Sequence, residues 1–185
     1  MRAVIFLDVD GVLNSLRSCV GLGGYRADQL DPVAMGLLNA LCREAQEAGV
    51  QVDVVISSTW RKKYDVLTWW TDLFAGHSDC PAVKVVGMTP SLGGRRGEEV
   101  RVWLANNNRY HRHVILDDDK DFDDDQPLIL VEPWGGLNLN HIDEAHFLLT
   151  GQRMFPEGLQ GAGKWGQLKL LGDVLARHPF GRAAA

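Results

Sequence analysis

An apolar run near the start of the chain stops abruptly at two carboxylates. Residues 4–7 read Val-Ile-Phe-Leu, and Asp8, Asp10 and Gly11 follow directly. Four apolar residues rich in β-formers are typical of a strand buried on both faces, and functional groups of open α/β sheets gather at the carboxyl ends of such strands. Two acids this close repel each other, so a cation or a shared proton must stabilise them. The run therefore predicts a buried strand that ends in an acidic site.

Two less specific explanations fit the same residues. A calcium loop also contains Asp-x-Asp, but it carries a further acid or amide before its Gly and ends in Glu, whereas Gly11 follows Asp10 directly. An Asp can also form an ordinary turn at the end of a strand. The rest of the chain has to decide between a turn and a site.

The composition predicts one globular domain without membrane segments. The chain has 185 residues, of which 45% are hydrophobic, and this suffices for a full core. No stretch approaches the roughly 18–20 apolar residues of a membrane span, and the first residues lack the pattern of an export signal. Cys19, Cys42 and Cys80 form no close pair, which is typical of reduced thiols. We expect a cytoplasmic protein that does not contact a membrane.

Charge is distributed unevenly along the chain. The formal net charge is −5, and seven of the nine residues from Asp117 to Asp125 are Asp. A chain of this sign is not built for unspecific binding of duplex nucleic acid, although the basic clusters 61–63 and 95–96 could hold a phosphate. A small phosphate, or a phosphate at the end of a polymer, remains a plausible ligand.

Strand and helix patterns alternate through the first 150 residues. This alternation predicts a parallel, three-layer α/β/α sandwich with a Rossmann-like sheet. We expect a loop over 15–26, and further strands at 52–56, 83–86, 113–116 and 128–131. We expect helices from Pro32 to Gly49, through Trp69 and Phe74, and over 98–104.

Residues 151–185 are predicted to be an extension packed on the core formed by residues 1–150. One short helix is expected between Gln167 and Arg177. The segment 158–164 matches the first part of a P-loop, but Trp165 stands where a Ser or Thr must bind magnesium, and no good strand precedes it. We interpret this match as accidental.

Four motifs in order resemble those of the haloacid dehalogenase (HAD) superfamily of phosphohydrolases. They are the acids and Gly of 8–13, the strand and hydroxyls of 54–58, the basic pair 95–96, and the strand and acids of 114–118. The residues in these motifs are similar to those of a branch of the superfamily found in phages and bacteria, which includes phosphatase domains associated with RNA repair. The resemblance covers residues 2 to about 149 and implies a HAD-like fold.

The chemistry of the acids can be argued from the residues themselves. A phosphate monoester is a dianion, so a carboxylate reaches phosphorus only when cations neutralise both partners. Mg²⁺ suits this role, and Asp8 with Asp117 or Asp118 supplies oxygen ligands. Asp8 is the expected nucleophile, which would form an aspartyl-phosphate, and Asp10 the expected general acid and base. The resemblance adds that the backbone carbonyl of Asp10 binds the metal.

The expected phosphate-binding residues are Ser57, Ser58 and Arg96. A hydroxyl at the end of a buried strand can donate to phosphoryl oxygens, and we favour Ser57 for this position, although either serine could instead cap the next helix. Arg96 suits the fixed cation of the third motif, with Arg95 as the alternative. Asp121 could orient the metal ligands.

No insert is long enough for a folded cap domain, so the resemblance implies a capless phosphatase with an open mouth. Trp60, Trp69 and Trp70 could stack a base, although burial in the core is the commoner fate of such residues, and the basic segment 61–63 could meet a second phosphate. These features predict a Mg²⁺-dependent phosphomonoesterase acting on a nucleotide or on a nucleic-acid terminal phosphate. The alternative is a catalytically weak phosphate-binding or protein-interaction module of the same fold.

Overall fold

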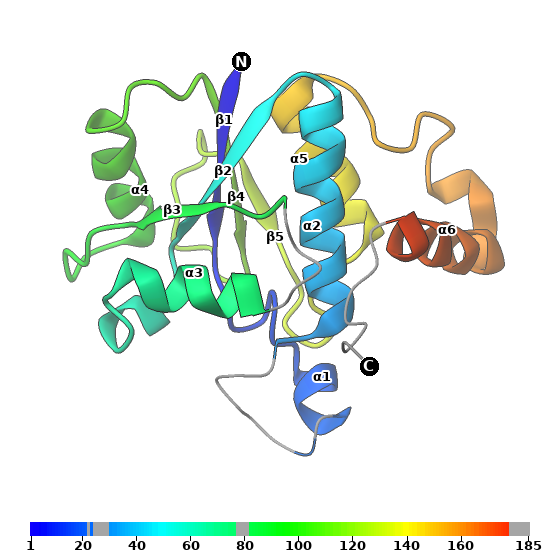
Figure 1. Cartoon of the computed structure of the whole chain (residues 1–185), viewed down its shortest axis with the longest axis horizontal. Coiled ribbons are helices and arrows are strands. Elements are labelled where there is room, and N and C mark those ends of the chain that lie inside the picture. The colour runs from blue at the N-terminus through cyan, green and yellow to red at the C-terminus, as the bar shows by residue number, and fades with distance from the viewer. Residues whose placement is uncertain (22, 24–29, 77–81, 178–185) are drawn as a thin grey trace.

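Five parallel strands form one sheet with helices on both faces (Figure 1). The computed structural model describes residues 1–21, 23, 30–76 and 82–177. The order of the strands across the sheet is β3-β2-β1-β4-β5. The strands are β1 (Arg2–Leu7), β2 (Gln51–Ile56), β3 (Val85–Met88), β4 (Arg112–Asp117) and β5 (Leu128–Leu130). The predicted α/β sandwich with a parallel, Rossmann-like sheet is confirmed.

Two hydrophobic cores lie on opposite faces of the sheet, because successive strand residues point to opposite sides. The helices are α1 (Leu16–Gly21), α2 (Pro32–Glu47), α3 (Leu67–Gly76), α4 (Arg96–Ala105), α5 (Leu139–Thr150) and α6 (Gly163–Arg177). Ile5 and Leu7 pack in the core that contains α2 and α5. Val4 and Phe6 pack against Trp103 of α4 on the other face. Figure 1 shows α4 on one side of the sheet and α2 and α5 on the other.

The register of the central strands brings the ends of three motifs level. Leu7 of β1 is paired with Ile56 of β2 and with Leu116 of β4. The residues that follow these three, Asp8, Ser57 and Asp117, therefore lie side by side at the carboxyl edge of the sheet. The chain adds β2 and β3 on one side of β1, and then β4 and β5 on the other side. The direction in which strands are added therefore reverses between β1 and β4. Ligands of open α/β sheets bind in the crevice at such a reversal.

The predicted helix after Asp31 is confirmed. Pro32 occupies the first turn of α2, and the carboxylate of Asp31 accepts a hydrogen bond of 2.9 Å from the backbone N–H of Val33. Gly49 follows the helix with a φ of +82°, a conformation that favours glycine. The strand predicted at 52–56 and the helix predicted through Trp69 also form, as β2 and α3.

The predicted boundaries of one strand and one helix were wrong by about two residues. β3 runs from Val85 to Met88 rather than over 83–86, since its pairing with β2 shifts register between Val54 and Val55. α4 starts at Arg96 rather than at residue 98, because a carboxylate from another loop satisfies its first N–H group.

Two helices were not predicted. The expected loop over 15–26 contains the six-residue helix α1, whose start is stabilised by a hydrogen bond of 3.1 Å from the N–H of Ser18 to the Ser15 hydroxyl. Part of the remaining predicted loop, including residues 22 and 24–26, lies outside the described residues. Cys80 also lies outside them. Helix α5 begins at the cap residue Asn138 and ends at Gly151, whose φ is +84°.

The segment after α5 packs on the helical layer. Helix α6 is longer than the helix predicted there, its residue Val174 is fully buried in the main core, and Arg177 forms an ion pair of 3.2 Å with Glu44 of α2. Lys164 lies in the first turn of α6 and no described strand leads into it, so the structural context of a P-loop is missing. None of the helices in the described ranges has the length and apolar character needed to cross a bilayer.

Candidate active site

Three carboxylates converge at the carboxyl ends of β1 and β4. One oxygen from each of Asp8, Asp117 and Asp118 lies within 4.8 Å of the others. Asp8 and Asp117 are almost completely buried, while Asp118 is partly exposed. The backbone N–H of Asp8 donates to the carbonyl of Leu116 at 2.9 Å, so the sheet itself fixes the two strand ends against each other. The structure thus brings together three of the four predicted metal ligands.

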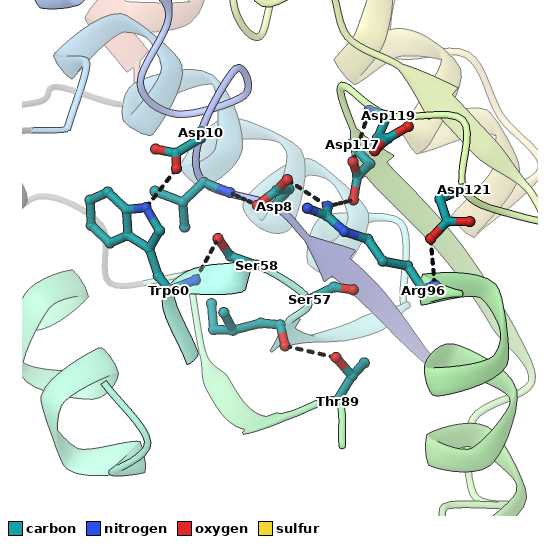
Figure 2. A network of polar contacts seen from close by, with 12 residues as sticks. Asp8, Asp10, Ser57, Ser58, Trp60, Thr89, Arg96, Asp117, Asp119 and Asp121 are labelled. Atoms are coloured by element: carbon teal, nitrogen blue, oxygen red, sulfur yellow. Dashed lines mark hydrogen bonds and ion pairs between the residues drawn. The ribbon is translucent and has the colours of Figure 1, made fainter. Parts of the chain in front are cut away.

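Arg96 neutralises two of these acids. One of its terminal nitrogens donates to Oδ2 of Asp8 at 2.6 Å and to Oδ2 of Asp117 at 2.5 Å (Figure 2). Its side chain is only 16% exposed, so this charge is weakly screened by solvent. Arg95, the alternative considered from the sequence, is 51% exposed and pairs with Asp123. Of the two arginines, Arg96 is therefore the one that faces the strand ends.

Gly11 permits the close approach of the Asp118 carboxylate. Its φ is +73°, and a Cβ atom at this position would lie 2.3 Å from Oδ2 of Asp118. Any larger residue would both strain the backbone and displace that carboxylate. The loop after β1 and the loop after β4 therefore meet at a point that only glycine fits.

Asp10 lies beside the carboxylate trio but is held differently. Its Oδ2 accepts a hydrogen bond of 2.7 Å from the indole N–H of Trp60 (Figure 2). Its Oδ1 is buried and makes no hydrogen bond to any described residue. The Asp10 side chain is not part of the trio, so its predicted contribution to a metal, through its backbone carbonyl, stays a prediction.

The two serines after β2 differ in what their hydroxyls do. Both side chains are fully buried. The Ser58 hydroxyl accepts a hydrogen bond of 3.3 Å from the N–H of Trp60 and so caps the short helical turn at 59–62. The Ser57 hydroxyl has no partner within the described part of the chain. A buried polar group without a partner calls for an explanation, and a phosphoryl oxygen of a substrate would supply one.

Two other predicted contacts were wrong. Arg61 was expected to be available for a second phosphate, but it is 6% exposed. It donates to the carbonyls of Ser57 and Ser58 at 3.1 and 2.5 Å, and it forms an ion pair with the buried Glu99. Because its guanidinium binds two carbonyls of its own loop and an acid on α4, Arg61 braces the loop after β2 instead of reaching into solvent.

Asp121 does not contact the predicted metal ligands either. Its Oδ2 accepts a hydrogen bond of 3.0 Å from the N–H of Arg96, the first residue of α4, and its Oδ1 pairs with Arg95 at 3.3 Å. A carboxylate at a helix N-terminus satisfies an otherwise unpaired N–H and interacts well with the helix dipole. Asp121 thus positions Arg96 through its backbone, and acts on the cation rather than on the acids.

The aromatic residues after β2 pack against one another. Tyr64 and Trp69 are stacked with ring centroids 3.9 Å apart, and Trp69 meets Trp70 edge-on at 4.8 Å. Trp70 is fully buried, and its indole N–H donates to the carbonyl of Tyr64 at 2.8 Å. We call Trp60, Tyr64, Trp69 and Trp70 the aromatic cluster. Its rings use much of their faces for internal packing.

Burial and mutual repulsion raise the pKa values of three acids. Burial raises the pKa of Asp117, the charge of Asp8 raises it further, and Arg96 opposes both effects. Burial also raises the pKa of Asp118 and of Asp10, in each case with a further contribution from Asp8. The hydrogen bond from Trp60 opposes the shift at Asp10. Perturbed carboxyl groups in a cleft are a common mark of a functional site.

The trio fits a hard divalent cation. Carboxylate oxygens are the ligands that Mg²⁺ prefers, and Mg²⁺ is usually held by a few carboxylates together with water and substrate oxygens. A cation here would relieve the repulsion that raises the pKa values of Asp117 and Asp118. Asp8, Asp117 and Asp118 are the residues that would hold it.

The structure has a parallel sheet with acids at the ends of β1 and β4, a buried serine after β2 and a basic residue at the start of α4. This is the arrangement that the resemblance to the HAD superfamily implies. A family model described as "HAD domain in Swiss Army Knife RNA repair proteins" matches residues 4–142. The chain belongs to this family, which indicates a phosphatase-type hydrolase. No curated protein and no solved structure matches the chain.

Sequence reasoning missed three residues that support the site. Trp60, Arg61 and Glu99 make side-chain contacts between segments that are far apart in the chain. Trp60 and Arg61 were noted only as a stacking residue and a surface cation. A single signal was available: both follow the second motif directly, where the chain has to hold the phosphate-binding loop.

Proposed function

We propose that this protein is a Mg²⁺-dependent phosphomonoesterase that removes a terminal phosphate from a nucleic acid or a nucleotide. One observation carries the proposal: Asp8 lies between two further acids that suit a cation and an arginine that is fixed beside it. A carboxylate beside Arg96 can approach a phosphate dianion because the guanidinium offsets their repulsion, and a cation held by the acids would offset it further. The family's name supports a nucleic-acid end as the substrate.

The first step transfers the phosphoryl group to the protein. A carboxylate oxygen of Asp8 forms a bond to phosphorus, and the bond between phosphorus and the ester oxygen breaks. Asp10 gives its proton to that leaving oxygen. Ser57 donates a hydrogen bond to a phosphoryl oxygen, and Arg96 offsets the negative charge on the transferring group. Bound Mg²⁺ would supply further charge neutralisation at Asp8, Asp117 and Asp118.

The second step releases phosphate. Asp10, now ionised, accepts a proton from a water molecule whose oxygen attacks phosphorus, and the bond from phosphorus to Asp8 breaks. Both carboxyl groups return to their starting states. Splitting one difficult displacement into two easier ones is the advantage of a covalent intermediate.

The arrangement around the strand ends suits a large substrate. Among the described residues, the segment between β1 and α2 contains only the six-residue helix α1, and the segment between β2 and β3 contains only a 3-10 turn and α3. Neither forms a cap domain in the described part. A site that lacks a cap domain in the described part of the chain suits the end of a polymer, whereas a small substrate needs another surface to exclude water.

The test is phosphate release from end-phosphorylated oligonucleotides and from free nucleotides, with Mg²⁺ and with a chelator. We expect Mg²⁺-dependent release by the wild type, and a loss of roughly 10⁴-fold or more in Asp8→Asn, which keeps the shape but lacks the nucleophile. Activity on free nucleotides but not on oligonucleotides would restrict the substrate to nucleotides. Phosphate binding without any release would instead support the binding-module alternative.

A further inference from the structure

We propose that Trp60 is a positioning residue that holds the carboxyl group of Asp10 in the orientation needed for proton transfer. The role rests on the proposed function, since Asp10 has a proton to deliver only when an ester is cleaved at Asp8. The contact joins the loop after β1 to the loop after β2, across 50 positions of the sequence. Neither the family match nor the four motifs assigns a role to this tryptophan.

The indole favours one of the two oxygens of Asp10 as the carrier of the proton. The N–H of Trp60 donates to Oδ2 at 2.7 Å, and an indole nitrogen can only donate. Oδ2 must therefore act as an acceptor, whether Asp10 is neutral or ionised. Because a carbonyl oxygen is a better acceptor than a carboxyl hydroxyl oxygen, this contact favours the proton of the neutral carboxyl group on Oδ1, the buried oxygen that has no partner among the described residues. The hydrogen bond survives proton transfer, so the carboxyl group need not rotate between the two steps.

Trp60 is itself fixed from two directions. Its backbone N–H donates to the Ser58 hydroxyl at 3.3 Å. Its ring lies 6.0 Å from that of Tyr64 and 6.5 Å from those of Trp69 and Trp70, measured between ring centroids. A large ring packed this closely loses little further freedom when it makes a hydrogen bond. The indole is thus a preorganised donor.

The same loop also carries the Ser57 hydroxyl, which has no partner among the described residues. Arg61 braces this loop through the carbonyls of Ser57 and Ser58. The expected phosphate donor and the residue that orients the general acid therefore lie on one rigid segment. Catalytic groups have to be held within a fraction of an ångström of their working geometry, and a shared support of this kind achieves that.

A simpler explanation is that Trp60 only packs in the aromatic cluster. The two roles differ in what the N–H group contributes. Trp60→Phe keeps an aromatic ring but removes the donor, so a packing role predicts a similar loss for every substrate. A positioning role predicts a loss only where the leaving group needs a proton.

The experiment compares two phosphate esters through kcat/KM, which reports the steps up to the first cleavage. One is p-nitrophenyl phosphate, whose leaving group departs without a proton, and the other is an alkyl ester such as a phosphorylated oligonucleotide. In Trp60→Phe we expect the alkyl ester to lose about tenfold or more and the aryl ester to change by less than about twofold, since general acid catalysis contributes roughly 10²–10⁴-fold. Trp69→Phe is the matched control in the same cluster: it keeps the N–H of Trp60, so any loss it causes should be equal for the two esters.

Two further measurements separate orientation from folding. The double variant Trp60→Phe/Asp10→Asn should be no slower on the alkyl ester than Asp10→Asn alone, because the two residues act as one unit. In NMR spectra, Asp10→Ala should shift the indole N–H signal that Trp60→Phe removes. Equal losses on both esters in Trp60→Phe, additive losses in the double variant, or an unmoved indole signal would each overturn the positioning role. Hydrolysis of neither ester by the wild type would instead overturn the proposed function, and this role with it.

Discussion

The two ends of the acidic segment 117–125 contain the same residue type in opposite surroundings. Asp117 ends a central strand and is fully buried, whereas the side chain of Asp125 is 71% exposed. The two ends also have different arginine partners: Arg96 bridges Asp8 and Asp117. At the exposed end, Arg101 of α4 pairs with Asp125 and Asp123, and Arg95 pairs with Asp123 and Asp121. Exposed ion pairs are screened by water and contribute little, while an unpaired buried charge is strongly unfavourable. Position relative to the sheet, rather than residue type, separates a site from a solvated surface.

The largest expected effect comes from the two adjacent arginines. Arg96→Ala leaves Asp8 and Asp117 buried without their cation, so we expect a loss of about 3 kcal/mol in the free energy of unfolding in the presence of a chelator. Phosphate release should fall by roughly 10²–10³-fold, since a fixed donor to the transferring group is lost. Arg95→Ala is the control. Urea unfolding and phosphate release measure both variants, and similar losses in the two would remove the distinction drawn above.

The two serines give the next largest effect. Ser57→Ala should slow phosphate release by roughly 10²-fold because it removes a donor to the phosphoryl group. It should leave stability almost unchanged, because the Ser57 hydroxyl makes no hydrogen bond to the described residues. Ser58→Ala should instead lower the free energy of unfolding by about 1 kcal/mol through loss of a cap. Kinetics together with thermal unfolding test this, and the reverse pattern would assign the phosphate contact to Ser58.

A smaller effect is expected for single acids of the segment. Asp118→Asn should weaken Mg²⁺ binding by roughly 10–100-fold, because it removes the charge of one of three converging oxygens. Asp124→Asn, in the exposed part of the same segment, should leave the affinity unchanged. Isothermal titration with Mg²⁺ alone provides the measurement. If both substitutions weakened binding equally, the metal would be held by the diffuse charge of the whole segment.

The smallest effect distinguishes two glycines with similar backbone angles. Gly11→Ala and Gly49→Ala both place a side chain at positive φ, and each should cost about 1–2 kcal/mol of stability. Only at Gly11 does the new Cβ meet a neighbour, the Asp118 carboxylate. Gly11→Ala should therefore weaken Mg²⁺ binding as well, whereas Gly49→Ala should not. Unchanged Mg²⁺ affinity in Gly11→Ala would show that the loop can move without disturbing the trio.

Much of the fold was predictable, because its strands are short apolar runs that end in polar residues. The central strands are buried on both faces, and such strands cannot alternate polar and apolar residues. Helix α5 was missed although Leu139, Ile142, Ala145 and Leu149 recur at helical spacing between a cap residue and a glycine. Helix α1 offers no comparable signal. Its first N–H group donates to the carbonyl of Pro133, so contacts with a distant segment stabilise it.

The sequence predicted the residues at each strand end of the candidate site, because each of them belongs to a local motif. It did not predict the contacts between distant segments. The residues after β1, β2 and β4 were identified, and parallel pairing brings such residues together. The contact of Arg61 with Glu99 joins the segment after β2 to α4, and that of Trp60 with Asp10 joins it to the loop after β1. The relative placement of these segments depends on the whole sheet. No local pattern encodes these contacts. The choice between Arg95 and Arg96 also needed the start of α4, which Asp121 sets from another loop.

The level endings of β1, β2 and β4 have a practical consequence for protein engineering. Because backbone pairing sets the spacing of Asp8, Ser57 and Asp117, the reactive geometry is inherited from the most rigid part of the molecule. Segments beyond the strand ends, such as α1 and the loop that leads into α5, could be exchanged to alter selectivity while the central strands are kept. Libraries aimed at new substrates should therefore vary these peripheral segments first.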